Sequence, residues 1–515
     1  MKKIITIVLF GFIIILSSCK DEIDELFLNP DGATDTKIEY LFADAMKQRG
    51  AFLRMGYNPQ GYYLILQGIA PWIQLAGNEA NDSKMMDVIA NMSSNSWNQY
   101  YKNFLSKVVE MEILYEALPD EEKGDYDVYM NMIKVVRAVA TSKMTDLYGD
   151  IPYSEAGQAR RVGGSIYPKY DSQQSIYTSI LADLKETSAF FSSFSPNESL
   201  PHSKLSTQDL LNGGDASKWL RLSNSLRLRF AMRILDADPS LATTTVNEVA
   251  NADLVTTNAL NIYELAKDPD GLNHRGGDGR LFGRAFNDRE SRTWAPELMV
   301  NMMNEANDPR RLYCFNQTTA GEYKGTPSSP DEIALVQNDF NTDNYSYINT
   351  DLILDNLYLP GIVFTSSEVH FLLAEAAMKG IISDDPKMHY DTALEQSVEF
   401  YHDLISFNTE ASYDAPLSTD IDNLVNASTF TYDGTMEQLA TQKWIHLGIN
   451  QPNEAYATWR RHDLPVLQDN ISEGSPLVIP VKITIPSTEK NLNEENYNAV
   501  KADDTPDTKV WWDIN

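Results

Sequence analysis

Residues 365–380, TSSEVHFLLAEAAMKG, contain the start, the apolar face and the end of one helix. Thr365 and Glu368 have the spacing of a capping box, in which the two side chains bind backbone N–H groups of the first turn. Apolar residues then recur at helical period, at Val369, Leu372, Leu373, Ala376 and Ala377. Gly380 follows as a typical C-terminal cap. The stretch therefore predicts an amphipathic helix that packs against other helices.

The same periodicity recurs along much of the chain, so the predicted fold class is mainly α. Residues 128–147 repeat it and run into the turn sequence LYGDIP. Further helices are expected at 97–118, from Gln173 onward, from an Asp215 cap through Ile234, at 435–448 and at 453–462. Their pairing at moderate intervals indicates tetratricopeptide-like helical hairpins, although the strict repeat signature is absent. A few short strands are expected, at 477–481 and 482–485.

Long polar segments separate the expected helices. Loops of this length are uncommon in compact domains unless they bind something. Binding residues are also concentrated in loops that a rigid scaffold positions. We therefore expect long irregular ligand-binding loops at 153–172, 194–214, 266–293, 316–350 and 408–433.

The N-terminus has the features of a bacterial lipoprotein signal. Lys2 and Lys3 precede an apolar run that is too short to span a bilayer, and LSSC at 16–19 follows as a lipobox. We predict that residues 1–18 are a signal peptide and that the thiol of Cys19 receives lipid. The alternative is an ordinary secretory signal with a chance cysteine at the cleavage point. No second apolar stretch is long enough to cross a membrane, so 19–515 is expected to be a body held on a lipid tether. Its length suits one large architecture or two to three small domains, and the family resemblance described below implies a single domain over 19–515.

Composition limits the partners and the chemistry. The 515-residue chain has a net charge of −31, which disfavours nucleic acid and anionic membrane surfaces. Its 26 Tyr and 8 Trp are too many for a disordered chain and can supply ring-lined binding surfaces. If Cys19 carries lipid, Cys314 has no disulfide partner, and its apolar neighbours Leu312, Tyr313 and Phe315 indicate a buried side chain.

Motifs spread over nearly the whole chain resemble the SusD/RagB family of nutrient-binding outer-membrane lipoproteins. They are TDLYGDIPYSEA at 145–156, LRLRFAMR at 226–233, NDPR at 307–310, SEVHFLLAEA at 367–376, QKWI at 442–445, WRR at 459–461 and VWWD at 510–513. The resemblance implies a tetratricopeptide-like scaffold with a loop-rich binding region. It also implies a lipid-anchored protein that captures an oligosaccharide and passes it to a SusC-like TonB-dependent outer-membrane transporter. Lys20, Asp21 and Glu22 resemble the signal that directs such lipoproteins to the cell exterior.

The resemblance implies a binding protein and no enzymatic activity. The sequence contains no HExxH, GxSxG or P-loop motif, and its seven His are scattered. A peptide-binding member of the family is the first alternative. A surface glycoside hydrolase is a less favoured one, because 73 acidic residues allow a carboxylate pair without indicating where it lies. A third is an adaptor protein that binds no small ligand.

Aromatic residues in the loops are the candidate ligand contacts. Flat rings stack on the apolar faces of sugars, while amide and guanidinium groups bind the hydroxyls. The predicted ligand-binding residues are Trp72, Asn78, Arg289, Trp294, Tyr323 and Tyr345, with Tyr347 beside the last of them. For each tryptophan a place in the core is an equal alternative.

We predict that four arginines have structural roles and do not contact the ligand. Arg227 and Arg233 lie on an otherwise apolar helix and are predicted to pair with carboxylates or to cap carbonyls. The same role is predicted for Arg460 and Arg461. Trp444 and Trp459 have helical neighbours and are predicted to be core residues.

One acidic turn is similar to a calcium-binding loop. DPDGLN at 268–273 has oxygen ligands at alternate positions, but Gly279 occupies the position where an EF-hand loop needs glutamate. We therefore expect no metal and no cofactor, with calcium kept as the alternative to a plain Asp- and Gly-rich turn.

Overall fold

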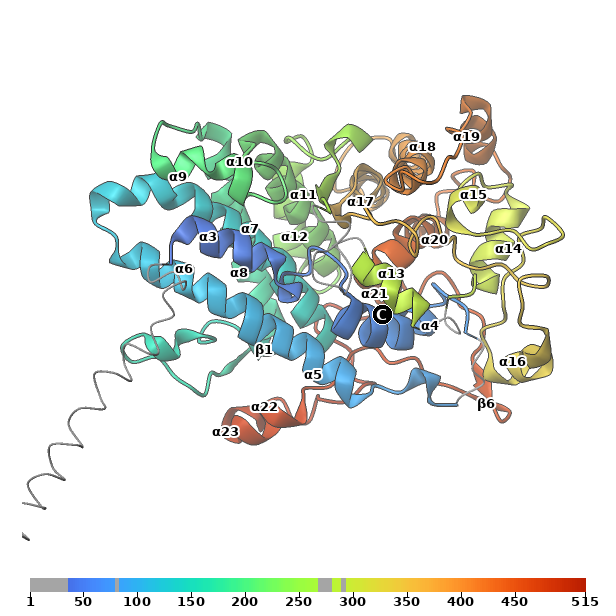
Figure 1. Ribbon diagram of the computed structural model, residues 1–515, viewed down its shortest axis with the longest axis horizontal. Coiled ribbons are helices and arrows are strands. Elements are labelled where there is room, and N and C mark those ends of the chain that lie inside the picture. The colour runs from blue at the N-terminus through green and yellow to red at the C-terminus, as the bar shows by residue number, and fades with distance from the viewer. Residues whose placement is uncertain (1–35, 79–82, 267–279, 289–292) are drawn as a thin grey trace, which may run out of the picture.

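The computed structural model describes residues 36–78, 83–266, 280–288 and 293–515 (Figure 1). The predicted signal peptide, Cys19, Arg289 and the turn at 268–273 all lie outside these residues. Over the described part the chain is mainly helical, which confirms the predicted fold class. No helix in that part is both long enough and apolar enough to cross a membrane.

The N-terminal third forms a layer of long helices. The segments α5, η4 and α6 follow one another without a break, so the helix predicted at 97–118 begins earlier and includes a π-helical stretch. The helices of this part are α3 (Ile38–Lys47), α4 (Ala70–Trp72), α5 (Ala90–Asn98), α6 (Ser106–Ala117), α7 (Asp120–Tyr148) and α8 (Gln173–Ser193). The π-helices are η2 (Tyr57–Ile69) and η4 (Gln99–Leu105), and the 3₁₀ turns are η1 (Arg49–Ala51), η3 (Ser83–Met86) and η5 (Gln158–Arg160).

Helical hairpins form the middle of the molecule. They pack as α8 on α7, α11 on α12, α17 on α18 and α20 on α21, which agrees with the predicted tetratricopeptide-like pairing. Their bounds are α11 (Ala216–Ile234), α12 (Pro239–Val249), α17 (Ser366–Met378), α18 (Pro386–Ile405), α20 (Met436–Leu447) and α21 (Pro452–His462). The predicted N-caps are confirmed, because Thr365 accepts the N–H of Glu368 and Asp215 accepts the N–H of Ser217. The reciprocal half of the predicted capping box is not confirmed, because the carboxylate of Glu368 binds the guanidinium of Arg229.

Short elements connect the hairpins. All five of the segments predicted as long loops contain helices or 3₁₀ turns. The short helices are α9 (Leu200–Ser203), α10 (Leu205–Gln208), α13 (Arg280–Asn287), α14 (Glu297–Glu305), α15 (Arg311–Cys314), α16 (Pro330–Val336), α19 (Ser418–Val425), α22 (Ser487–Leu492) and α23 (Glu494–Tyr497), with 3₁₀ turns η6 (Asn258–Leu260), η8 (Gln337–Asp339) and η9 (Gly448–Asn450). The antiparallel strand pairs are β1 (Ile151–Pro152) with β2 (Tyr170–Asp171), β3 (Ile262–Glu264) with β4 (Gly361–Phe364), and β5 (Ile471–Ser472) with β6 (Ser475–Pro476).

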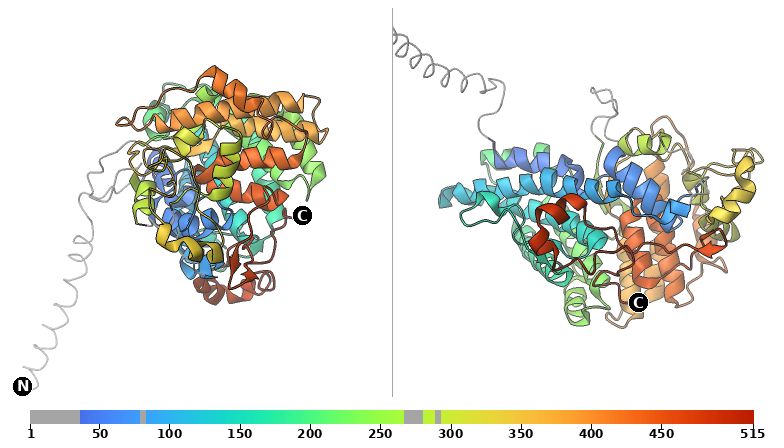
Figure 2. Two further views of the ribbon diagram at one scale, coloured as in Figure 1. Left: turned by 90° about the vertical axis from the view of Figure 1, so that its right-hand side faces the viewer. Right: turned by 90° about the horizontal axis from the view of Figure 1, so that it is seen from below.

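The strands predicted at 477–481 and 482–485 are wrong. This stretch is extended but pairs with no neighbouring strand, and Pro480 lacks the N–H group that a ladder requires. Ile483 instead donates its N–H to the carbonyl of Leu147 at 2.8 Å, at the end of α7. The views in Figure 2 show the C-terminal segment (red) packed beside the N-terminal helices (blue and cyan).

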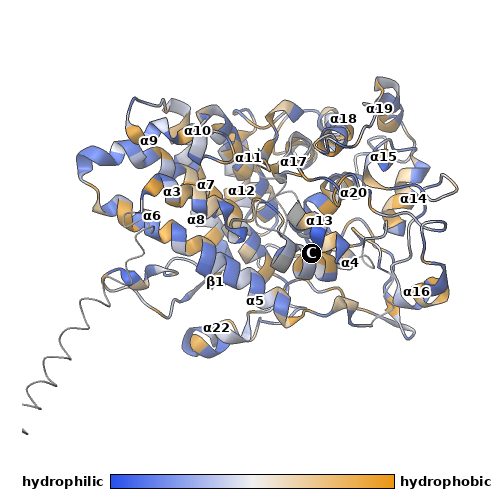
Figure 3. Ribbon diagram, in the orientation of Figure 1, coloured by the Kyte–Doolittle hydropathy of each residue, from blue (hydrophilic) through white to orange (hydrophobic). Residues whose placement is uncertain are grey.

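A large apolar core runs through the hairpins, and most helices have both apolar and polar residues, as amphipathic helices do (Figure 3). Trp444 is fully buried, and Trp459 is partly buried against the core, as predicted. Cys314 is buried as well, and burial raises the pKa of its thiol well above the ordinary value. This disfavours the reactive thiolate and confirms the interpretation of Cys314 as a core residue.

A buried network of charges joins the hairpins. Arg233 binds both Asp146, on α7, and Glu454, on α21, the latter at 2.7 Å. Arg229 binds Glu368 of α17 at 2.7 Å and approaches Glu454 at 3.7 Å. Burial pushes the pKa of Glu454 upward, but the two arginines outweigh burial and lower it to about 2. We call these five residues the arginine network. It bears out the predicted pairing of Arg233 with carboxylates.

Another buried titratable group should make the fold sensitive to acid. His446 has no exposed surface; its Nε2 lies 2.8 Å from the hydroxyl of Thr365 and its Nδ1 lies 2.9 Å from that of Ser397. Burial, together with Arg310 and Lys443, lowers the pKa of this imidazole to about 3. In the unfolded chain the imidazole takes up a proton below about pH 6.5. Stability from this group is therefore complete above pH 6.5 and is lost as the pH falls toward 3.

We expect this histidine to reduce the free energy of unfolding by about 1.4 kcal/mol per pH unit between pH 6 and 4. Urea unfolding at several pH values would measure the slope. The variant His446→Gln, which cannot titrate, should show a slope that is shallower by this amount. Equal slopes in the two proteins would show that His446 does not remain neutral in the fold.

Candidate functional site

Irregular chain segments around α14, α15 and α16 occupy one end of the molecule (Figure 1). Isolated β-bridges connect them: Trp294 pairs with both Gly77 and Tyr347, and Phe315 pairs with Ile348. The N–H of Ile348 also donates to the carbonyl of Thr293 at 2.9 Å. Backbone hydrogen bonds therefore hold these loops in place, although regular strands are absent from this part of the described chain.

A cavity of about 370 Å³ lies between α13 and the loop at 342–350. We call it the aromatic cavity. Its apolar lining consists of Phe286, Tyr345, Tyr347, Ile348, Ile353 and Leu354. Its polar lining consists of Asn287, Thr293, Asn316, Gln317, Thr342, Asn349 and Thr350. The volume is within the range of small-molecule sites, which combine an apolar surface with a few positioned polar groups.

Tyr347 forms a supported ring at this cavity. It is partly exposed, and the indole of Trp294 stacks on it with ring centroids 3.9 Å apart and an interplanar angle of 22°. Trp294 itself is only 2% exposed, and the ring of Phe340 packs against it edge-on at 5.5 Å. One face of Tyr347 is thus covered by protein, and the ring is held in place where it borders the cavity. A ring held in this way can stack on an apolar ligand face with little loss of entropy.

Tyr345 contributes a second ring from the same loop. Its ring centroid lies 4.8 Å from the ammonium of Lys324 and 5.4 Å from the ring centroid of Phe340. Burial, followed by the nearby charge of Asp339, raises the pKa of its hydroxyl. The hydroxyl therefore stays protonated at neutral pH and can donate a hydrogen bond.

The amide groups of the lining are oriented by the protein. Asn349 donates from Nδ2 to the hydroxyl of Tyr413 at 3.0 Å, and its Oδ1 accepts the N–H of Asp351 at 3.0 Å. Asn316 accepts the N–H of Thr350 at 3.1 Å. Fixed amides and hydroxyls beside aromatic rings are suited to binding the hydroxyl groups of a sugar.

The described lining contains no charged side chain. Glycoside hydrolysis by the usual route needs two carboxyl groups on either side of the bond that is cleaved. The described lining does not supply such a pair, and the groups it does supply are suited to binding.

Two residues predicted from sequence lie away from the aromatic cavity. Trp72 is fully buried, its Nε1 donates to the carbonyl of Met85 at 3.1 Å, and its ring packs near Tyr456. It therefore has no accessible face and occupies the core position that the sequence left as the alternative. Asn78 is also buried; it follows Gly77, whose N–H donates to the carbonyl of Trp294 at 2.7 Å. Neither side chain lines the cavity.

The other predicted residues divide between the cavity and its surroundings. Tyr345 lines the cavity, and Trp294 lies directly behind Tyr347. Tyr323 does not line it, and its ring packs under the guanidinium of Arg311 at 5.4 Å. Arg289 lies outside the described residues.

Sequence reasoning did not single out several lining residues: Phe286, Asn316, Gln317 and Asn349. All four belong to the segments 266–293 and 316–350, which were predicted to be ligand-binding loops. Their position in those loops was the available signal, because isolated amides and one phenylalanine form no recognisable motif.

Among the described residues, no three His, Cys, Asp or Glu side chains are arranged to hold a metal ion. The acidic turn at 268–273 lies outside those residues, so calcium at that turn stays an untested alternative.

Known proteins with a similar sequence pattern or a similar structure share this helical fold. A SusD-like family model, described as "Starch-binding associating with outer membrane", matches residues 55–486. A solved structure named "chitin-binding protein" is 24% identical with a TM-score of 0.76, and the match covers 93% of this chain and 100% of that one. A chitin-binding SusD homolog from Flavobacterium johnsoniae is 20% identical with a TM-score of 0.71, covering 93% and 99%.

A SusD homolog from Parabacteroides distasonis is 19% identical with a TM-score of 0.73, and the match covers 93% of this chain and 98% of the homolog. At these identities the structural likenesses show a shared fold. A search of curated proteins gave no match.

Proposed function

The chain belongs to the SusD-like family, and on this premise we propose that it is a binding protein that captures a neutral oligosaccharide in the aromatic cavity. The observation that carries the proposal is the ring of Tyr347, which borders the cavity and is supported from behind by Trp294. A sugar ring can stack on it while the neighbouring amides and hydroxyls bind the sugar hydroxyls.

Two further observations support a neutral glycan. The family description refers to starch binding, and two of the similar structures are named as chitin-binding proteins. The described lining of the cavity has no arginine or lysine that could pair with an acidic sugar. A carboxylate or sulfate buried there would lose its hydration without gaining an opposite charge.

We also propose that the protein is anchored to the outer membrane through lipid on Cys19, faces the cell exterior and delivers its ligand to a SusC-like TonB-dependent transporter. The lipobox and the family description support this arrangement. High affinity is not required, because tethering to the transporter raises the local concentration of captured ligand. The proposed role is capture and transfer without catalysis.

Calorimetric titration tests the proposal. The protein would lack residues 1–18 and carry Cys19→Ala, and the panel would contain starch-type and chitin-type oligosaccharides, uronic-acid oligosaccharides and oligopeptides. We expect saturable binding of a neutral glycan and none of the acidic glycans. Binding of peptides alone would favour the peptide-binding alternative, and cleavage of a glycan during the titration would favour the hydrolase.

A further inference from the structure

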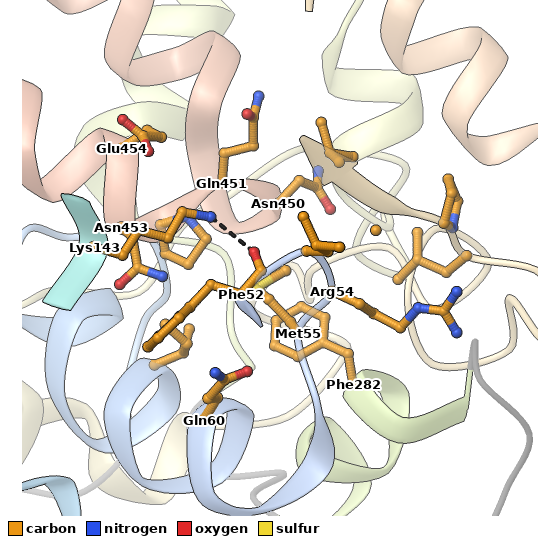
Figure 4. Close-up of a pocket in the computed structure, with 17 residues that line it drawn as sticks. Phe52, Arg54, Met55, Gln60, Lys143, Phe282, Asn450, Gln451, Asn453 and Glu454 are labelled. Atoms are coloured by element: carbon orange, nitrogen blue, oxygen red, sulfur yellow. Dashed lines mark hydrogen bonds between the residues drawn. The ribbon is translucent and has the colours of Figure 1, made fainter. Parts of the chain in front are cut away.

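A second, more polar pocket lies one helical turn along α13 from the aromatic cavity, and Figure 4 shows its lining. Phe286 of α13 lines the aromatic cavity, whereas Phe282, one turn earlier, lines this pocket. Its other walls come from the chain after η1, from Lys143 of α7 and from residues 450–454. We call it the polar pocket. Its volume is about 40 Å³, which is room for about three water-sized groups.

Several buried amide atoms in its lining have no hydrogen-bond partner within the described chain. Asn450 is 4% exposed, and its Oδ1 is unpaired. Its amide N–H side faces the hydroxyl of Tyr401 and lowers the pKa of that phenol. Nε2 of Gln451, which is 6% exposed, and Oδ1 of Asn453 are also unpaired. Buried polar groups in native proteins are nearly always paired, so this concentration in one pocket indicates a missing partner.

Lys143 adds hydrogen-bond donors at the same place. Its Nζ donates to the carbonyl of Phe52 at 3.0 Å, the dashed contact in Figure 4. An ammonium has three N–H groups, so two are left for a ligand. Glu454 also lines the pocket, but its carboxylate is already bound in the arginine network. The lysine is partly exposed through the pocket, and burial lowers the pKa of its amine to about 8.

The unpaired atoms define the chemistry of the ligand. Donors come from Lys143 and Gln451, and acceptors come from Asn450 and Asn453. A carboxylate offers only acceptors and would face the two amide oxygens unfavourably, whereas a hydroxyl group both donates and accepts. The oxygen and nitrogen of a side-chain amide can be assigned either way round. With either assignment, the pocket still contains both hydrogen-bond donors and hydrogen-bond acceptors.

We propose that the polar pocket binds a small group bearing two or three hydroxyls, which is either a free polyol of the size of glycerol or the hydroxymethyl end of a saccharide. The pocket does not contact the aromatic cavity through any shared lining residue. The proposal therefore stands whether or not the aromatic cavity binds a glycan.

Protection of Lys143 from acetylation gives the first test. Intact protein is treated with acetic anhydride at pH 8, with glycerol, methyl β-glucoside or sodium acetate present, and acetylation is measured by peptide mass spectrometry. Lys134 lies on the same helix, pairs with Glu186 at the surface, and is the internal control. At ten times its dissociation constant, a bound probe should reduce acetylation of Lys143 about tenfold. Acetylation of Lys134 should not change.

Saturation-transfer NMR with the same three probes gives a direct second measurement. The leucine variants Asn450→Leu and Gln451→Leu are made in a Tyr347→Ala protein, so that a sugar in the aromatic cavity does not contribute to the signal. Binding of glycerol or the glucoside should be lost in both, and one variant suffices if the other does not fold. It should be kept in Asn426→Ala, an exposed asparagine, and in Tyr347→Ala, which alters only the aromatic cavity. Binding of glycerol alone identifies a free polyol, and binding of the glucoside alone identifies a saccharide end.

Three results would overturn the proposal. Protection by acetate without protection by the hydroxyl probes would show an anion site. Binding of the hydroxyl probes that survives in both leucine variants would place them elsewhere. No binding and no protection by any probe would show that water alone fills the pocket.

Discussion

Replacing Arg233 with methionine should lower the free energy of unfolding by about 3–5 kcal/mol. The side chain is 5% exposed and binds Asp146 and Glu454, which are themselves buried. Methionine would fill much of the space but would leave Asp146 without its main counter-charge and Glu454 with Arg229 at 3.7 Å and the more distant Lys143. The cost comes from these unpaired charges and not from a lost surface ion pair. Urea unfolding at pH 7, monitored by tryptophan fluorescence, would measure it.

Arg221→Met is the matched control on the same helix. Arg221 pairs with Asp253 at 3.0 Å, but that carboxylate is 57% exposed and stays hydrated when its partner is removed. Exposed pairs of this kind contribute about 0–1 kcal/mol. A loss below about 1 kcal/mol for both variants would mean that the network is reached by water and is not a buried ion cluster.

The arginine network illustrates which features of the fold can be predicted from the amino-acid sequence and which cannot. Charged residues within an apolar helical stripe have to be paired, so a structural role for Arg227 and Arg233 followed from their positions. The partners did not follow, because Asp146, Glu368 and Glu454 lie on three other helices. Helix periodicity and capping residues are local signals, and they were sufficient to predict the helical hairpins. The arrangement of the hairpins depends on contacts between distant segments.

In the loops around the aromatic cavity, the sequence predicted the segments but not the individual residues that line the cavity. Trp72 and Trp294 were both predicted to contact ligand, yet Trp72 is enclosed in the core and Trp294 supports the ring of Tyr347. The difference arises because a β-bridge places Trp294 beside Tyr347, far along the chain. Loop length identified two segments that line the aromatic cavity, but a cavity built from several loops leaves no spacing that a single sequence could reveal.

Replacing Tyr347 with alanine should weaken glycan binding by at least about 30-fold, or about 2 kcal/mol. The ring borders the aromatic cavity and is held by Trp294 at 3.9 Å, so alanine removes both the stacking surface and the cover of the indole. Tyr347→Phe keeps the ring and should retain most of the affinity. Titration of each variant with the glycan selected by the panel would measure the effect.

Tyr323→Ala tests whether aromatic loop residues outside the cavity also contribute to glycan binding. Its ring packs on Arg311 and does not line the cavity, so its removal should leave affinity within about twofold of the parent protein. Equal losses for Tyr323→Ala and Tyr347→Ala would mean that the ligand binds across the outer loop surface. Unchanged affinity in Tyr347→Ala, with the variant shown to be folded, would place the glycan outside the aromatic cavity. Only a loss confined to Tyr347 is consistent with a sugar that stacks on the ring that Trp294 supports.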